Sequence, residues 1–451
     1  MLRFGTDGVR GVAGRELTAE LVLALGRAAA RALGTELPFL VARDTRLSGP
    51  MIEAALVAGL GSEGAGAELL GVLPTPGLAA ACAAAGAPGA MISASHNPFP
   101  DNGVKFFEPG GRKLRDATEE RIEAELASLL AESPPGSEGR SIGTVVARVD
   151  AVEAYVARLV GAVAPAVEPL KGLHVVVDCG NGAASEAAPR ALAGLGARVT
   201  VMAADPDGTN INDRCGSTFT GPLQARVVAE GADAGLAFDG DADRVVAVDE
   251  TGAIVDGDHI LAVAALDLDA RGRLRNRAVA TTVMANLGLR RALEQHGIGV
   301  VETPVGDRHV LAAMEEHDLV LGGEQSGHVI FADHAVTGDG PLTGILLLDA
   351  VVRSGRPLSE RASVMSRHPQ VLRNVAVASR EGLDAAAGFW SAVRDLEREL
   401  GDAGRVLVRP SGTEPVVRVM VEAGDEERAS AGADRLAAAL VDALGPPPGT
   451  S

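Results

Sequence analysis

The chain has 451 residues, and a length of about 150 residues per domain predicts three to four domains. Apolar residues make up 47% and charged residues 22%, which excludes disorder over most of the length, while aromatic residues are only 2%. The net charge of −19 argues against non-specific binding to nucleic acid or to acidic membranes.

The first third of the chain, residues 1–149, alternates predicted helices and strands. Thr18 can cap a helix that ends at Gly34, and Ser48 can open the next one. We expect strands at 38–44, 67–72 and 89–93, a charged helix near 116–131, and a linker at 133–139. Strands alternating with helices of this length are typical of βαβ units.

Three more units of comparable size follow. Residues 150–255 carry predicted strands at 173–178, 198–203 and 234–239. Residues 256–368 carry a helix at 259–268 and strands at 278–283 and 318–323. Residues 369–451 carry alternating strands near 371–379, 405–409 and 416–423, followed by a helix at 427–444. We therefore expect α/β domains over 1–149, 150–255 and 256–368, and a smaller sheet domain over 369–451.

The three cysteines are an odd number without CxxC spacing, so neither a disulfide scaffold nor a structural zinc site is expected. This number and spacing of cysteines is typical of a protein in a reducing compartment. The N-terminus shows no apolar stretch of a secretory signal, which favours a cytoplasmic protein. Residues 69–100 lack charge over a length that could span a bilayer, but their prolines and polar end indicate buried α/β core, so we expect no membrane association.

The strongest chemical signal is DGDADR at 239–244, directly after a predicted strand. Its three aspartates repel one another unless a cation neutralises them, and oxygen ligands suit Mg²⁺ or another hard ion. Two alternatives stay open. One is a solvated acidic turn. The other is an EF-hand, because Asp239, Asp241, Asp243 and Glu250 fit positions 1, 3, 5 and 12, although Arg244 stands where glycine is required.

ISASHNP at 92–98 places Ser95 at the end of a predicted strand, where α/β folds carry reacting groups. His96 adjoins Ser95, and the side chains of sequence neighbours diverge, so an ordinary Ser–His hydrolase pair is not expected. A polar turn that simply ends the strand is the alternative. The segment DNGVKFF puts Lys105, one of only three lysines, within reach of the same strand end.

Two further segments suit a phosphorylated sugar. In GGEQSGH at 322–328, Glu324 and Ser326 can bind hydroxyls, and His328 can exchange protons near neutral pH. A buried structural histidine is the alternative. In RPSGTEP at 409–415, followed by Arg418, guanidinium, hydroxyl and backbone N–H groups could coordinate a phosphate, although a plain turn is also compatible.

Taken in order, these segments resemble the α-D-phosphohexomutase superfamily, most closely its phosphoglucosamine mutases. The matching text is FGTDGVRG, ISASHNP with DNGVKFF, PDGTNINDRCGST, DGDADR, VGDR, GGEQSGH and RPSGTEP, from residue 4 to about 420. The resemblance implies a four-domain heart-shaped phosphohexomutase fold, with three α/β mixed-sheet domains and a C-terminal α+β domain like the TATA-binding protein.

It also implies an isomerase that interconverts glucosamine 6-phosphate and glucosamine 1-phosphate through a phosphoserine and a bisphosphorylated sugar, feeding amino-sugar and peptidoglycan precursor synthesis. Gln325 favours the amino sugar. A phosphomannomutase/phosphoglucomutase is the near alternative, and a Mg²⁺-dependent phosphatase or a non-catalytic sugar-phosphate sensor the distant ones. The implied partners are a hexosamine phosphate, an activating sugar bisphosphate and a second copy in a homodimer.

The resemblance assigns roles residue by residue. Ser95 would carry the phosphoryl group and, with Asp239, Asp241 and Asp243, hold Mg²⁺. Groups matched to the reacting centre are Arg10, His96, Lys105, Arg244 and His328. Groups matched to substrate binding are Glu324, Ser326, Arg409, Ser411, Gly412, Thr413 and Arg418. One departure is Ala242, where the family often has glycine; it removes backbone freedom but no ligand.

Overall fold

The structure is a computed structural model that describes residues 8–132, 134–163, 167–410 and 416–446. It consists of two compact units. The first comprises residues 1–284 and 297–364, and the second comprises 285–296 and 365–451. Each unit is described by itself.

The first unit begins with a six-stranded sheet in the order β1-β5-β4-β2-β3-β6, in which β5 alone runs against its neighbours. Its strands are β1 (Val9–Val12), β2 (Phe39–Arg43), β3 (Ala67–Val72), β4 (Gly89–Ile92), β5 (Asp101–Phe107) and β6 (Val145–Ala147). Its helices are α1 (Ala19–Leu33), α2 (Gly49–Ser62), α3 (Thr75–Ala85) and α4 (Asp116–Glu132), with a short 3-10 turn at Gly139–Ser141. As predicted, the Thr18 hydroxyl caps α1, accepting from the backbone N–H of Leu21.

A second mixed sheet has the order β11-β10-β9-β7-β8. Its strands are β7 (His174–Asp178), β8 (Arg198–Met202), β9 (Ala234–Phe238), β10 (Val245–Asp249) and β11 (Ile254–Val255). The helices of this region are α5 (Ala151–Gly161), α6 (Ala184–Gly194) and α7 (Gly221–Glu230). Every residue of β7, β9 and β10 is buried, which explains their continuous apolar sequence.

A third mixed sheet has the order β13-β12-β14-β15. Its strands are β12 (Ala278–Thr282), β13 (Gly299–Thr303), β14 (Leu321–Gly323) and β15 (Val329–Phe331). Its helices are α8 (Gly257–Ala270), α10 (Asp307–Glu316), α11 (Gly340–Ser354) and α12 (Leu358–Ala362), with a 3-10 turn at Arg275–Arg277. The three mixed sheets lie in one compact unit, and the expected boundaries after residues 149, 255 and 368 stay predictions.

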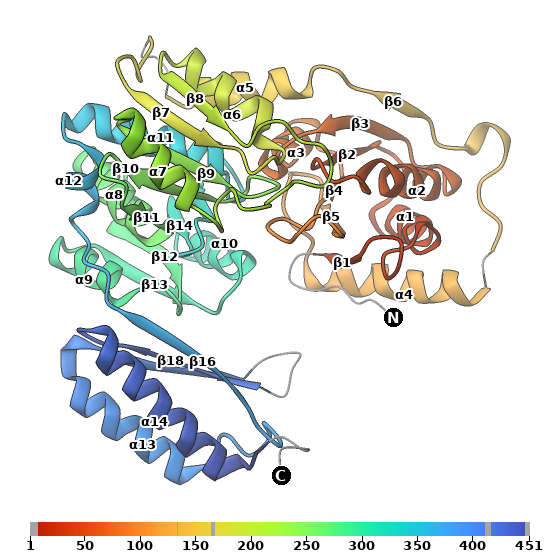
Figure 1. Cartoon of the computed structure of the whole chain (residues 1–451). Helices are drawn as coiled ribbons and strands as arrows, with labels where there is room; N and C mark the ends of the chain where they lie inside the picture. Colours follow the sequence, from red (N-terminus) through yellow and green to blue (C-terminus); the bar gives the residue numbers. More distant parts are fainter. Residues whose placement is uncertain (1–7, 133, 164–166, 411–415, 447–451) are drawn as a thin grey trace. The chain divides into compact units, whose positions relative to one another are not determined.

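The second unit is an antiparallel sheet with the order β16-β18-β17, against which α13 and α14 pack (Figure 1). Its elements are α9 (Leu287–Gln295), β16 (Gln370–Ala376), α13 (Ala387–Leu400), a 3-10 turn (Gly401–Ala403), β17 (Arg405–Pro410), β18 (Val416–Glu422) and α14 (Glu426–Leu444). This α+β arrangement agrees with the expected small sheet. No helix among the described residues is both long and apolar enough to cross a membrane.

Several elements of the structure were not among those expected, and β6 and α13 are two of them. The predicted linker leads into β6, which pairs with β3, but three exposed residues are too few to show a pattern. Helix α13 was missed because Ala386, which precedes it, forms no side-chain capping bond and gives no start signal.

Candidate active site

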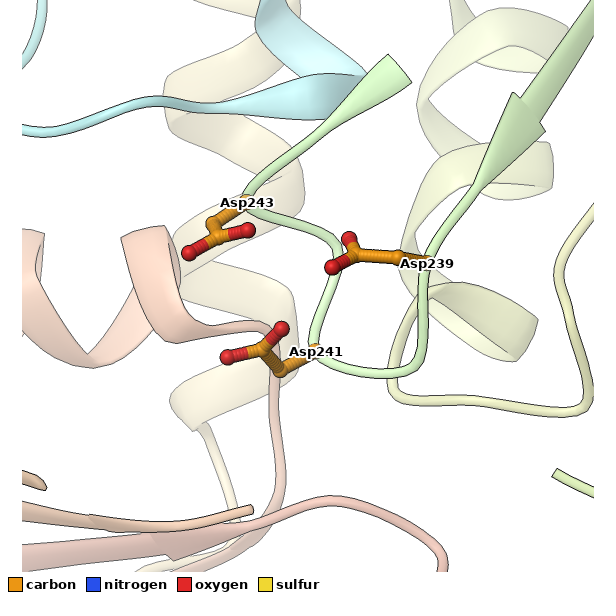
Figure 2. Close-up of side chains that lie close together, drawn as sticks. All are labelled: Asp239, Asp241 and Asp243. Carbon is orange, nitrogen blue, oxygen red and sulfur yellow. The ribbon is translucent and has the colours of Figure 1, made fainter. Parts of the chain in front are cut away.

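Three buried aspartates converge in the loop that joins β9 to β10 (Figure 2). One oxygen from each of Asp239, Asp241 and Asp243 lies within 4.8 Å of the others. Ala242, within this loop, adopts the left-handed conformation with φ of +57°, which explains why glycine suits this position. The loop thus presents three carboxylates to one point, as the metal-loop interpretation predicted.

The hydrogen bonds of these carboxylates leave room for a cation. Asp241 Oδ2 accepts from Lys105 Nζ (2.7 Å) and from Thr75 Oγ1 (2.7 Å). The Oδ1 atoms of Asp241 and Asp243 are buried without a hydrogen-bond partner among the described residues. Burying a carboxylate oxygen without a partner is energetically unfavourable. These carboxylate oxygens are therefore suited to bind a hard divalent ion.

The charges in this cluster influence one another strongly. Burial, together with repulsion from Asp243 and Asp241, raises the pKa of Asp239 well above its usual range. Burial also disfavours ionised Asp243, but Lys105, His328 and Arg244 hold its pKa well below the usual value. The cations around Asp243 therefore keep it ionised, whereas ionisation of Asp239 needs more positive charge nearby.

The two alternatives to a metal loop are both wrong. All three aspartates are buried, which excludes a solvated turn. Residues 245–249 form β10, and the side chain of Glu250 accepts hydrogen bonds from the backbone and hydroxyl of Ser359 instead of joining the aspartates. An EF-hand needs that glutamate as a ligand.

Ser95 reaches this cluster from the loop after β4. It is buried, has φ of +53°, and its hydroxyl donates to Asp239 Oδ2 at 2.6 Å. His96 Nδ1 lies 3.4 Å from Ser95 Oγ and 3.4 Å from Arg244 Nη1. Burial and the charges of Arg244 and Arg10 lower the pKa of His96, so its ring favours the neutral form. The Ser95 proton points to Asp239, unlike that of a Ser–His hydrolase.

His328, just before β15, is buried. Its Nδ1 is 3.7 Å from Asp243 Oδ2, and its Nε2 accepts from the backbone N–H of Gly338 at 2.9 Å. An accepting Nε2 requires the ring proton to sit on Nδ1, facing Asp243. Burial lowers the pKa of His328, but Asp243 and Asp307 more than offset this and raise it above the usual value.

Two arginines complete the charged surroundings. Arg10 lies on β1, opposite Gly103 of β5. The backbone N–H of Arg244 donates to Asp239 Oδ1 at 3.2 Å, and its Nε is 3.7 Å from Asp243 Oδ1. The first unit therefore gathers side chains from five loops and strands around one centre.

The loop after β14 carries Glu324 and Ser326. Glu324 accepts from the backbone N–H of Gly306 (3.1 Å) and from the Ser326 hydroxyl (3.2 Å). The backbone of Gly327 accepts from Val245 N at 3.1 Å, so the loop is tied to the residue that follows the aspartate loop. Ser326 is exposed, as a ligand-binding hydroxyl should be.

Arg409 and Arg418 face each other on β17 and β18 of the second unit. Burial, and then the charge of Arg418, lower the pKa of Arg409. Like charges directly opposite on neighbouring strands are unfavourable without an anion between them. The predicted partners Ser411, Gly412 and Thr413 lie outside the described residues.

Sequence reasoning missed several residues that support the centre. Thr75 opens α3 and bonds Asp241. Lys113 Nζ lies 2.5 Å from Asp307 Oδ2, which in turn is 3.4 Å from His328 Nε2. The rarity of lysine in this chain and the VGDR segment were the available signals for Lys113 and Asp307; nothing marked Thr75.

Comparisons with known proteins agree with this architecture. Models of the phosphoglucomutase/phosphomannomutase family match alpha/beta/alpha domain I at residues 1–132, domain II at 153–252, domain III at 256–368 and the C-terminal domain at 372–439. A phosphoglucomutase/phosphomannomutase family protein from Burkholderia thailandensis matches with a TM-score of 0.80 and 26% identity, covering 97% of both chains.

Two curated relatives are more similar in sequence. The phosphoglucosamine mutase of Streptomyces avermitilis is 52% identical over 451 residues, covering 98% of this chain and 99% of the relative. That of Thermobifida fusca is 52% identical over 448 residues, covering 98% of each. The resemblance inferred from the motifs is confirmed: the chain belongs to the phosphoglucomutase/phosphomannomutase family, among the phosphoglucosamine mutases.

Proposed function

We propose that this chain is an isomerase that interconverts glucosamine 6-phosphate and glucosamine 1-phosphate, with Ser95 as the carrier of the transferred phosphoryl group. The observation that carries this proposal is the 2.6 Å contact of the Ser95 hydroxyl with one of three converging buried aspartates. The 52% identity to phosphoglucosamine mutases supports the choice of the amino sugar.

Asp239, Asp241 and Asp243, together with an oxygen on Ser95, would hold a divalent metal, which we propose is Mg²⁺. When bound, such an ion neutralises charge on the oxygens of the transferring phosphoryl group. Lys105 and Arg244 add positive charge from the protein itself, since both side chains lie next to these carboxylates. Phosphoryl transfer depends chiefly on such charge and on alignment of the reacting atoms.

The chemistry consists of two transfers at Ser95 Oγ. In the first, the bond between Ser95 Oγ and phosphorus breaks as a sugar hydroxyl oxygen bonds to phosphorus, giving a sugar bisphosphate. Its hydroxyl proton passes to Lys105 or His328, the candidate bases. In the second, the phosphate that the sugar carried at the start is transferred to Ser95 Oγ. Its bond to the sugar oxygen breaks, and the base gives the proton back to that oxygen. An activating sugar bisphosphate would load Ser95 before the first turnover.

Recognition of the sugar phosphate needs groups away from the reacting hydroxyl. Glu324 and Ser326 offer an acceptor and an exposed hydroxyl for the sugar. His96 lies beside Ser95, and the charge of Arg10 acts on His96, so we assign contacts with the reacting phosphate to both side chains. We assign the non-reacting phosphate to Arg409 and Arg418, with Ser411, Gly412 and Thr413 as the accompanying donors.

A coupled assay on glucosamine, glucose and mannose phosphates tests the substrate. We expect the amino sugar to give the highest kcat/KM, whereas preference for glucose or mannose phosphate would favour a phosphomannomutase/phosphoglucomutase.

Ser95→Ala should lower turnover by about three orders of magnitude or more, because no other group relays the phosphoryl group. Ser141→Ala, an exposed serine, is the control. Near-normal turnover of Ser95→Ala would overturn the proposed carrier.

A further inference from the structure

The segment 206–218 carries a family motif but has no part in the reaction described above. The structure places one of its residues, Asn212, against the Ser95 loop. Asn212 Nδ2 donates to the backbone carbonyls of Ser95 (2.9 Å) and Asn97 (3.1 Å). The backbone N–H of Asn212 donates to Gly180 O at 2.9 Å, so the residue is anchored to the loop after β7. Asn212 therefore links the Ser95 loop to the sheet whose strand β9 leads into the aspartates.

Arg46 holds the same two carbonyls. Its side chain is fully buried, and its Nη2 donates to Ser95 O and Asn97 O, both at 2.8 Å. Its Nη1 donates to Pro98 O (2.6 Å) and to Asp101 O (3.0 Å). A guanidinium group has five donors in a fixed plane, so one side chain fixes most of this loop's backbone.

A second set of bonds starts from Asp44. Asp44 Oδ2 accepts from Arg46 Nε (2.9 Å) and from the Ser93 hydroxyl (2.6 Å). The Ser93 oxygen in turn accepts from the backbone N–H of Ser95 at 2.9 Å. Both backbone polar groups of Ser95 are thus tied to side chains that do not touch the reacting atoms.

These ties matter because Ser95 is held in an unusual conformation. Its φ of +53° is disfavoured for a residue with a side chain and persists only where the surroundings impose it. The fit is also tight: a Cβ on Gly240 would lie 2.5 Å from Ser95 O and 3.0 Å from Asn212 Nδ2. The direction of the Ser95 hydroxyl toward Asp239 therefore depends on where its carbonyl is held.

We propose that Arg46 and Asn212 are positioning residues that hold the Ser95 carbonyl from two different sheets and thereby aim the Ser95 hydroxyl at the aspartate cluster. Arg46 follows β2 of the first sheet, whereas Asn212 precedes β9 of the second. This inference rests on the proposed role of Ser95 and adds two residues outside the substrate and metal contacts.

The test replaces Asn212 with glycine. Glycine accepts the φ of +57° that Asn212 adopts, so Asn212→Gly removes the amide with little backbone strain. Asn276 offers a matched control: its φ is +55°, and its Nδ2 donates to two backbone carbonyls, His317 O and Asp318 O, away from the site. Asn276→Gly therefore reproduces the structural effect without the positioning effect.

We expect Asn212→Gly to lower kcat by about tenfold to hundredfold with KM within about twofold, because small misplacement of reacting groups slows transfer without removing substrate contacts. Intact mass should show slower uptake of one phosphate from glucose 1,6-bisphosphate. Asn276→Gly should keep the wild-type kcat and the wild-type rate of phosphate uptake. Arg46→Lys keeps the charge but loses the planar fork, and should slow phosphate uptake similarly.

Asn212→Asp has nearly the same shape but turns an oxygen toward the two carbonyls, so it should take up phosphate at least as slowly as Asn212→Gly. A thermal unfolding scan of each variant separates slow transfer in the folded protein from loss of folding. The proposal is overturned if Asn212→Gly and Asn276→Gly take up phosphate and turn over equally fast. If the wild type takes up phosphate on Ser95 but does not convert glucosamine phosphates, the substrate assignment fails and the positioning test still stands. If the wild type takes up no phosphate, the role of Ser95 fails.

Discussion

The acid that caps helix α11 is buried, and its ionisation should make folding stability depend on pH. Asp339 Oδ1 accepts from the backbone N–H of Leu342 (2.9 Å) and from the Tyr155 hydroxyl (2.7 Å). Burial raises the pKa of Asp339 to about 6. The folded protein therefore binds this proton more tightly than the unfolded chain, and the contribution of Asp339 to stability is lost as pH rises through 6.

Asp339→Asn should become more stable relative to the wild type as pH rises. Asparagine can accept both hydrogen bonds without ionising, so its advantage should grow by about 1 kcal/mol between pH 5 and pH 8. Urea unfolding at several pH values measures this difference. Asp425→Asn, at the exposed cap of α14, is the control and should show no such trend. A pH-independent difference for Asp339→Asn would contradict the prediction.

The metal loop gives a second prediction at the residue scale. Mg²⁺ should raise the Tm of the wild type, because a ligand that binds only the folded state stabilises it. Asp241→Asn removes one of the three proposed anionic ligands, so we expect this Mg²⁺-induced rise to be largely lost and EDTA-sensitive turnover to fall sharply. Asp318→Asn, an exposed partner of Arg275, is the control. An unchanged Mg²⁺ response in Asp241→Asn would exclude the assigned ligand.

At the scale of elements, helix α8 packs its first residue against the proposed sugar loop. A Cβ on Gly257 would collide with the backbone oxygen of Glu324 and lie 2.7 Å from the backbone nitrogen of Gly327. Gly257→Ala should therefore displace this loop and raise KM for the hexosamine phosphate several-fold. Gly221→Ala is a matched control, since Gly221 also begins a helix and its added Cβ would meet nothing within 4 Å. Equal KM values for the two variants would exclude a role of this packing.

The elements also show what the sequence could predict. Strands such as β4 and β9 are continuous apolar runs, and the loops that follow them hold Ser95 and the aspartates as short, contiguous motifs, so both were predictable. Arg46, Thr75 and Asn212 were not, because their roles arise from contacts between segments more than 45 residues apart. Such contacts follow from the packing of sheets, which local patterns do not specify.

For the whole molecule, the two units divide the proposed tasks. The first unit holds Ser95, the aspartates and the sugar loop, whereas the second holds the facing pair of Arg409 and Arg418. A phosphomutase must bind the phosphate that is not reacting in both half-reactions, whether it is attached to C1 or to C6. A phosphate site on the second unit would serve both orientations of the same sugar.

Arg409→Ala tests this division of tasks. Loss of a charge-assisted hydrogen bond to phosphate costs about 1.5–3 kcal/mol, so KM should rise about tenfold to hundredfold for both glucosamine 6-phosphate and glucosamine 1-phosphate. The Mg²⁺-induced rise in Tm should stay at the wild-type value, because the aspartates belong to the first unit. Arg435→Ala removes an exposed arginine of the second unit that pairs with Glu399, and should leave KM unchanged. If Arg409→Ala altered the Mg²⁺ response, or raised KM for only one of the two phosphates, the second unit would not be the shared phosphate site.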